Sequence, residues 1–173
     1  MPIVPETKSW TWVLERACPE CGFDASAVAF ADVPALLREN AASWPAVLER
    51  SDVRIRPDER TWSPLEYSAH VRDVFVVFSS RLALMLAEDD PSFENWDQDA
   101  TAVADRYAEQ DPAVVSAQLT DAAAALAADF DAVPAATLSR TARRSDGATF
   151  TIETLAQYFI HDPVHHLWDV THQ

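Results

Sequence analysis

The chain has 173 residues, 49% of them hydrophobic, which is enough for one domain with a single core. Its formal net charge of −15 at pH 7 argues against nucleic acids and anionic membranes as partners, because an acidic surface repels both. Only two glycines are present, which disfavours an all-β fold with many tight turns and favours helices.

No stretch of the sequence approaches the roughly 20 apolar residues of a membrane span. The first residues, MPIVPE, lack the basic start and apolar core of a signal peptide. We therefore expect a cytoplasmic protein. Residues 1–31 are expected to be an extension packed on the main body, with Trp10 and Trp12 docking it by their indole rings.

The two cysteines of the chain form a single Cys18-Pro-Glu-Cys21 element. One such pair supplies half of a structural zinc site, and no second pair or nearby cysteine–histidine element completes it. A passive or loop-stapling role is favoured, while redox and metal-binding roles stay open. A reducing cytosol argues against a permanent disulfide.

The first two helices are predicted from their start signals. Asp32 is a credible N-cap for a helix over residues 33–50, although Pro45 predicts a kink or an early end. Ser63 followed by Pro64 and Glu66 is typical of a capping box, and the helix it starts is expected to reach residue 88.

A connection of about twenty residues, 91–110, is long for a compact domain and is interpreted as a crossover over one end of a bundle, with a short helix within residues 100–108. Asp111 starts the third helix, which ends near residue 133. A tight turn is predicted at Asp146-Gly147. The fourth helix starts at Thr151, and Pro163 predicts either a kink or a fresh start capped by Asp162.

The histidines suggest a metal site. His161 and His165 stand four residues apart, so on a helix their imidazoles lie about 40° from each other, close enough to bind one cation. His70 lies in the middle of an apolar stripe of the second helix. We expect the fold to bring these three histidines together around Zn, Ni, Fe or Co, with coordination positions left open. The alternative is that His70 only packs in the core and that the C-terminal histidines lie at a solvated helix end.

Further residues are candidates for the surroundings of this site. His166 points about 100° further round the helix than His165, so it is assigned to the rim and not to the ligands. A neighbouring or pocket role is predicted for Asp73, Tyr67, Tyr158, Trp62, Asp162 and His166, with Asp169 as another acceptor for an imidazole. The candidates for holding an anionic ligand are Arg54, Arg56, Arg143 and Arg144; a solvated loop is the alternative for the first two.

The stretch WSPLEYSAHVRD over residues 62–73, followed by YFIH over 158–161 and then His165, resembles the DinB-like superfamily. That group includes metal-dependent thiol transferases and mycothiol-dependent maleylpyruvate isomerases. The resemblance implies an all-α four-helix bundle with a long crossover connection over residues 32–173, often dimeric. It also implies a divalent metal held by His70, His161 and His165. Pro163, inside the last motif, departs from the pattern.

The leading functional hypothesis is a metal-dependent enzyme that acts on a small molecule, as a transferase for a low-molecular-weight thiol or as an isomerase. The first alternative is a non-catalytic metal-binding or ligand-binding stress-response bundle. The second is a metal-free bundle whose histidines only pack.

Overall fold

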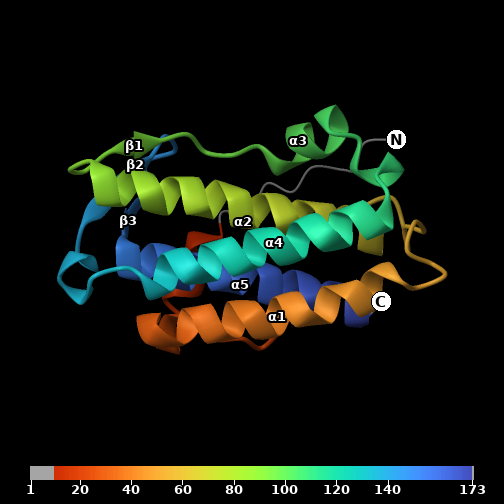
Figure 1. The fold of residues 1–173 in the computed structure, drawn as a ribbon, viewed down its shortest axis with the longest axis horizontal. Coiled ribbons are helices and arrows are strands. Elements are labelled where there is room, and N and C mark those ends of the chain that lie inside the picture. Colours follow the sequence, from red (N-terminus) through yellow and green to blue (C-terminus); the bar gives the residue numbers. More distant parts are fainter. Residues whose placement is uncertain (1–9, 173) are drawn as a thin grey trace.

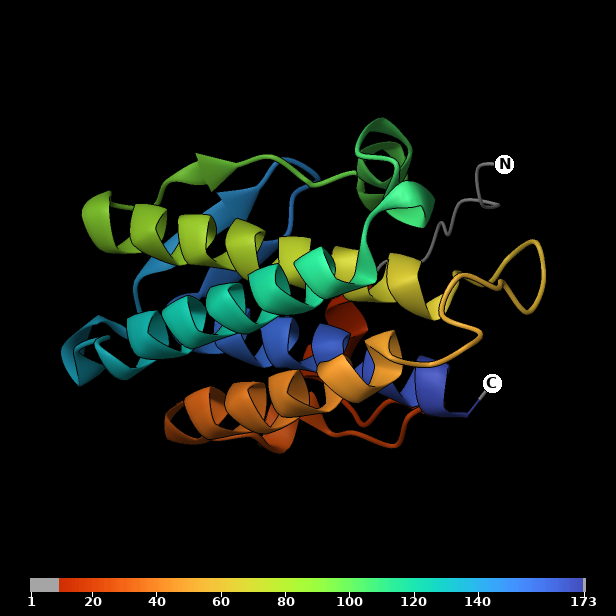
Figure 2. The same ribbon diagram turned by 45° about the vertical axis from the view of Figure 1, so that its right-hand side comes forward.

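Four long helices form the body of the protein, for which the computed structural model describes residues 10–172. The helices are α1 (Val33–Leu48), α2 (Pro64–Ala87), α4 (Pro112–Asp131) and α5 (Ile152–Thr171). Both α4 and α5 pack against α1 and against α2, so the order around the bundle is α1, α4, α2, α5 (Figures 1 and 2). The predicted four-helix bundle is confirmed.

Local capping fixes where these helices begin. The Ser63 hydroxyl accepts a hydrogen bond from the Glu66 amide, and the Glu66 carboxylate accepts one from the Ser63 amide, so the predicted capping box is present. The Asp111 carboxylate caps α4, and the Thr151 hydroxyl caps α5 by accepting from the amide of Thr154. The predicted starts of α2, α4 and α5 are therefore confirmed. α1 begins at Val33 as predicted, but the side chain of Asp32 makes no capping hydrogen bond.

Proline does not divide the helices. α1 runs through Pro45, and α5 is one helix from Ile152 to Thr171 with Pro163 inside it. The fresh helix start at Asp162, one of the two alternatives predicted for Pro163, is not found. The carbonyl of Pro163 accepts a hydrogen bond of 2.8 Å from Asn40 Nδ2, and Asn40 Oδ1 accepts one of 2.9 Å from Trp44 Nε1. α1 thus holds α5 at its proline.

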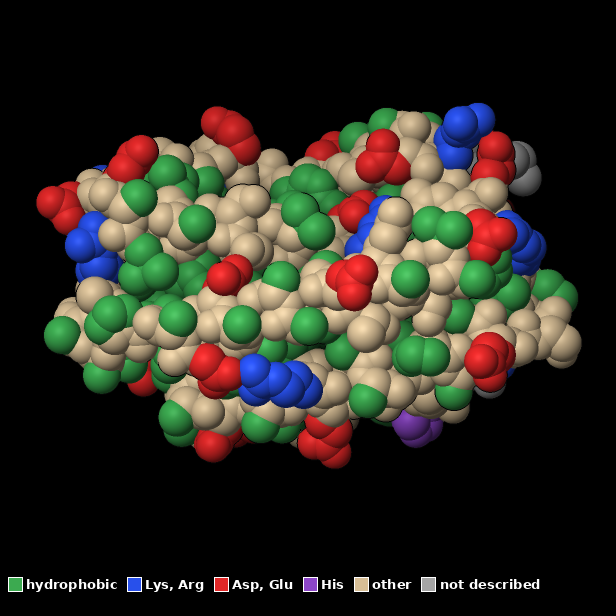
Figure 3. Space-filling view, viewed as in Figure 1, with side chains coloured by type: hydrophobic (Ala, Val, Ile, Leu, Met, Phe, Trp, Pro, Cys, Tyr) green, Lys and Arg blue, Asp and Glu red, His purple; other side chains and the backbone are tan. Residues whose placement is uncertain are grey.

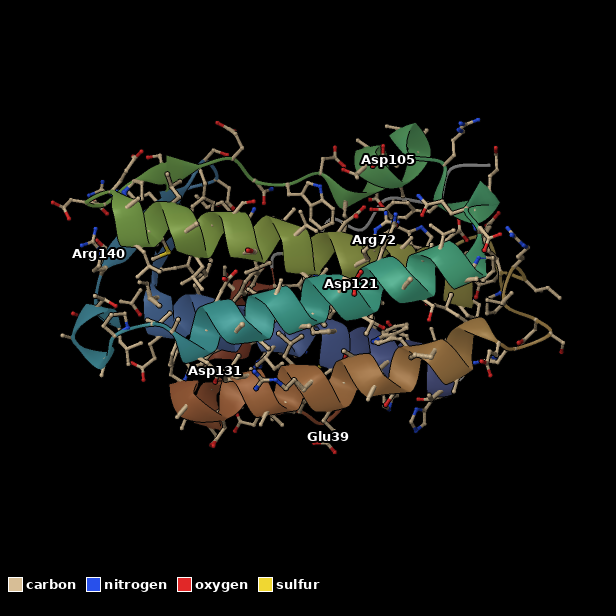
Figure 4. All side chains as sticks on the ribbon, in the orientation of Figure 1. Glu39, Arg72, Asp105, Asp121, Asp131 and Arg140 are labelled. Carbon is tan, nitrogen blue, oxygen red and sulfur yellow. The ribbon has the colours of Figure 1, made fainter. Side chains whose placement is uncertain are left out.

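The crossover between α2 and α4 contains β1 (Ser92–Phe93), α3 (Gln98–Ala104) and the 3-10 turn η4 (Tyr107–Glu109). β1 pairs in parallel with β2 (Thr141–Arg144), which pairs antiparallel with β3 (Thr149–Thr151). Only the turn of this small sheet was predicted; Gly147 lies in it with a φ of +95°. Arg140 fastens the sheet to the end of α2, where its guanidinium donates to the carbonyls of Met85 and Glu88 (Figure 4).

The segment before α1 contains the short 3-10 turns η1 (Thr11–Leu14), η2 (Ala25–Ala27) and η3 (Phe30–Asp32), followed at once by α1. η1 and η2 lie along α5 (Figure 2). The extension predicted over residues 1–31 thus runs along the bundle where it is described. Residues 1–9, on which the signal-peptide prediction rests, lie outside the described residues.

The core and the surface agree with the composition. Phe159 of α5 contacts Phe75 and Phe130, with ring centroids 5.9 and 5.5 Å apart, at the centre of the bundle. Acidic and basic side chains are scattered over the face in Figure 3, which shows no concentrated basic patch. Among the described residues, no helix has the length and apolar character needed to cross a membrane.

Candidate metal centres

Among residues 10–172, two groups of side chains with metal-ligating atoms contain residues of α5. The first contains His70, Asp162 and His166, and the second contains Cys18, Cys21, His161 and His165. Within each group, one ligand atom from every residue lies within 4.8 Å of the others. We call them the His70 centre and the cysteine centre.

The His70 centre joins α2 to α5. Asp162 Oδ1 lies 3.4 Å from His70 Nε2 and 3.8 Å from His166 Nε2. The rings of His70 and His166 lie 4.9 Å apart at an angle of 82°. Both ring nitrogens of His70 and Oδ1 of Asp162 are buried, and none of the three atoms has a hydrogen-bond partner among the described residues. Buried polar atoms are rarely left in this way, so this donor set fits a bound cation.

The protonation states of this centre also fit a cation. Burial lowers the pKa of His70, which leaves its imidazole neutral near pH 7. Burial alone would raise the pKa of Asp162, but its interactions with the neighbouring imidazoles of His70 and His166 outweigh this effect and lower that pKa to about 2. A neutral imidazole and an ionised carboxylate are the forms that bind metals.

Aromatic rings surround the His70 centre. The indole of Trp96 stacks on His70 at 5.3 Å with an interplanar angle of 4°, and Trp62 lies 5.2 Å from the same ring. Tyr67 lies 5.0 Å from the ring of His166. These walls limit water around the donor atoms, which strengthens electrostatic interactions there. The side chains of Asp162 and His166 remain 30% and 16% exposed and leave an approach from outside.

The cysteine centre joins the N-terminal segment to α5. Cys18 Sγ lies 3.6 Å from His165 Nδ1, and Cys21 Sγ lies 3.8 Å from His161 Nε2. Neither cysteine is in a disulfide. Burial lowers the pKa of His161 to about 4 and also lowers that of His165, so both imidazoles are neutral near pH 7.

The sequence predicted that His70 would come together with His161 and His165. The structure instead places His70 in one group and the other two histidines in the second. Consecutive residues of a helix point about 100° apart, so His161 and His165 share one face of α5, while Asp162 and His166 share the next. α2 lies against the second of these faces, and the N-terminal segment lies against the first. His166, assigned to the rim from the sequence, therefore stands beside His70.

The remaining pocket candidates have other contacts. Asp73 accepts hydrogen bonds from the hydroxyl of Tyr107 and from Nε of Arg72, and it belongs to neither group of candidate ligands. Tyr158 lies one helical turn before Asp162, and its hydroxyl accepts a 3.1 Å hydrogen bond from Arg144.

The four arginines considered for an anionic ligand are engaged by the chain itself. Arg54 donates to the carbonyls of Ala108 and Gln110. The other guanidiniums pair with carboxylates: Arg56 with Glu66, Arg143 with Asp90 and Arg144 with Asp146. Their contacts hold loops and helix ends.

Two signals in the sequence point to the observed grouping. Asp162 and His166 are four residues apart, the same spacing as His161 and His165. The CxxC element and the HxxxH element together supply the four ligands of a zinc site, although about 140 residues separate them. Asp169 links the centres: Oδ2 lies 2.9 Å from His166 Nδ1, and Oδ1 lies 3.7 Å from His165 Nε2.

An open hollow of about 700 Å³ lies near the His70 centre, although none of the candidate ligands lines it. It lies between α2 and the segment from Glu94 to Asp105, and Trp96, the ring that stacks on His70, forms part of its wall. A second hollow of about 610 Å³ between α1 and α4 contains none of the candidate ligands.

The comparisons with known proteins agree with this fold. The chain resembles the solved structure described as "YfiT from Bacillus subtilis is a probable metal-dependent hydrolase with an unusual four-helix bundle topology", at 19% identity and a TM-score of 0.64, over 99% of this chain and 93% of that one. No match is found among curated proteins. The family model of the DinB superfamily matches residues 29–170, which include α1, α2, α4 and α5. The chain therefore belongs to the DinB superfamily.

Proposed function

We propose that the protein is a metal-dependent enzyme whose cation is held by His70, Asp162 and His166. The observation that carries this proposal is a set of three buried atoms beside His166, two on His70 and one on Asp162. Within the part of the chain that the structure describes, these atoms lack hydrogen-bond partners. Two imidazoles and a carboxylate are a donor set for zinc or ferrous iron, and three protein ligands leave positions free for a substrate.

The surrounding residues support these ligands in distinct ways. Asp169 accepts from Nδ1 of His166 and so directs Nε2 of that ring toward Asp162. Trp96 stacks on the ring of His70 and Trp62 contacts the same ring, so the two indoles restrict its orientation. A divalent cation bound there supplies Lewis acidity, which lowers the pKa of a thiol or a water molecule and polarises a carbonyl group.

The first candidate reaction is transfer of a low-molecular-weight thiol to a small electrophile, or a thiol-dependent isomerisation. It follows from the resemblance of the motifs around His70 and His161 to thiol-using members of the superfamily. The arginines first considered for an anionic cofactor are engaged elsewhere, so recognition of the thiol falls to the hollow beside Trp96.

The second candidate reaction is hydrolysis. It is supported by the donor set, because two histidines and one carboxylate also hold the catalytic zinc of several hydrolytic enzymes. The description of YfiT as a probable metal-dependent hydrolase points in the same direction.

Asp162→Ala and His166→Ala test the proposal, with His172→Ala as the matched control. His172 is exposed and belongs to neither centre. Protein loaded with zinc or ferrous iron is assayed for conjugation of thiols to electrophiles and for hydrolysis of esters and amides. We expect Asp162→Ala and His166→Ala to lose one equivalent of metal and to reduce turnover at least about a hundredfold, while the control keeps both.

Equal turnover in the three variants would refute an enzyme based on this centre. Loss of metal from Asp162→Ala and His166→Ala, with no turnover in wild type by either reaction, would instead support the alternative of a non-catalytic metal-binding bundle. We also propose that the protein is a homodimer and that it is cytoplasmic. The molecular mass in solution tests the homodimer.

A further inference from the structure

We propose that Cys18, Cys21, His161 and His165 form a second metal centre, a structural zinc site that fastens the N-terminal segment to α5. The inference is independent of the proposed enzyme, because its ligands are separate from those of the His70 centre. Both cysteines also precede residues 29–170, the part of the chain that the family shares.

The distances between the ligand atoms fit tetrahedral zinc. Zinc–sulfur bonds of about 2.3 Å and zinc–nitrogen bonds of about 2.0 Å at a tetrahedral angle place S and N roughly 3.6 Å apart. Cys18 Sγ and His165 Nδ1 are 3.6 Å apart, and Cys21 Sγ and His161 Nε2 are 3.8 Å apart. A CxxC loop and an HxxxH pair are also common spacings for the two halves of such a site.

The backbone around each pair is shaped for this arrangement. The amide of Cys18 donates to the carbonyl of Phe23, and the amide of Gly22 donates to the carbonyl of Cys18. Gly22 has a φ of +74°, a conformation that favours glycine, and it closes the loop so that both sulfurs face α5. On α5, the rings of His161 and His165 lie 5.1 Å apart on one face.

The surroundings favour a closed site. Cys18, His161 and His165 are 2%, 4% and 5% exposed. The indoles of Trp10 and Trp12 lie 5.5 and 6.3 Å from the ring of His161. Four protein ligands under such a cover leave no position for a substrate, so the centre is structural and not catalytic.

Charge and hydrogen bonding complete the fit. Zinc binding releases the proton of each thiol, and two thiolates then neutralise the charge of the cation, which lowers the free energy needed to bury it. Nε2 of His165 lies 3.4 Å from the carboxylate of Glu20 and 3.7 Å from that of Asp169, acceptors that direct Nδ1 toward Cys18.

Such a site explains how a segment without long helices or strands is held on the bundle. Residues 10–31 contain only short 3-10 turns, whose few backbone hydrogen bonds stabilise them weakly. A zinc ion would close a loop of 147 residues between Cys18 and His165 and restrict the unfolded chain accordingly.

The first experiment measures zinc and thiols in the full-length wild type. We expect the two cysteines to resist alkylation by iodoacetamide in zinc-loaded protein and to react after zinc is removed by a chelator. Cobalt substituted for zinc should show the absorption of a tetrahedral ion with thiolate ligands. Equal alkylation before and after chelation would overturn the proposal.

The second experiment assigns the ligands. Cys18→Ser combined with Cys21→Ser should lose one equivalent of zinc and the thiolate absorption, whereas His172→Ala should keep both. Metal at the His70 centre is counted separately through His166→Ala, so failure of one centre is distinguishable from failure of the other. Retention of the full zinc content by the double cysteine variant would contradict the site.

Discussion

At the scale of single residues, Asp169 connects the two candidate centres. One carboxylate oxygen lies 2.9 Å from His166 Nδ1, and the other lies 3.7 Å from His165 Nε2. A carboxylate that receives the second nitrogen of a ligating imidazole fixes its tautomer and raises its basicity. One side chain therefore stands beside an imidazole of each centre, within hydrogen-bond range of His166 and within ion-pair range of His165.

Asp169→Asn is expected to weaken metal binding at both centres, by about 10- to 100-fold at each, because the amide is uncharged and supplies only one acceptor oxygen. Competition against a chromogenic chelator measures the two affinities. Unchanged affinity at both centres would show that Asp169 only packs beside the rings.

Glu66 is the second residue whose effect is predicted. Its buried carboxylate accepts from Ser63 and pairs with Arg56. Burial would raise its pKa, but the hydrogen bonds from Arg56 and Ser63 outweigh this and hold it below the ordinary value. The ionised Glu66 carboxylate therefore contributes its full stabilisation of the folded state above the ordinary pKa of a glutamate. This contribution is lost as the pH falls through the lowered pKa of the folded protein.

Glu66→Gln is expected to lower the free energy of unfolding by about 2 kcal/mol at pH 7, because a buried charged hydrogen-bond partner is lost. The difference from wild type should shrink as the pH falls below the ordinary pKa. Urea unfolding of both proteins at several pH values measures it. A difference that stays constant down to pH 3 would contradict the role of the ionised carboxylate.

At the scale of elements, the starts of the helices were predictable and their partners were not. Ser63, Asp111 and Thr151 cap their helices through atoms no more than three residues away, so the sequence alone contains the signal. The small sheet was missed because β1 pairs with a strand about fifty residues further along the chain, a contact that no local pattern encodes.

The same distinction applies to the metal-ligating side chains. The sequence showed that His161 and His165 share a face of a helix, and α5 bears this out. Which neighbour meets that face depends on tertiary packing, since the N-terminal segment and α2 cover adjacent faces of α5. Neighbouring residues on a helix point about 100° apart. His161 therefore faces the N-terminal segment, whereas Asp162, the next residue, faces His70 of α2.

Pro163→Ala is expected to stabilise α5. A proline inside a helix costs about 3 kcal/mol, and alanine restores a donor to the carbonyl of Phe159. Lost packing of the buried ring and greater freedom of the unfolded chain offset part of this gain. We expect the free energy of unfolding of the metal-free protein, measured in urea, to rise by about 1 kcal/mol. Pro45→Ala in α1 serves as a comparison. A free energy of unfolding of Pro163→Ala below that of the wild type would contradict the prediction.

At the scale of the whole molecule, we expect the bundle to fold without the N-terminal segment. The family model begins at residue 29, and the segment before it meets the bundle mainly along α5. The acidic charge of −15 belongs to the chain as a whole and favours cations over polyanions as ligands.

Removal of residues 1–28 is expected to leave the bundle folded but less stable, with the midpoint of thermal unfolding lowered by several degrees. The truncated protein should lose the zinc of the cysteine centre and keep the metal of the His70 centre. Circular dichroism and elemental analysis measure both. Loss of all helical signal would show instead that the segment is required for folding.

The distribution of tryptophan makes the two centres optically distinguishable. Trp10 and Trp12 lie against His161, whereas Trp62 and Trp96 lie against His70. Paramagnetic ions such as Co²⁺ quench indole emission at such short range. Each centre thus has its own intrinsic fluorophores. Titration with Co²⁺ of variants that retain only one of the two tryptophan pairs would record metal binding at each centre without an added dye.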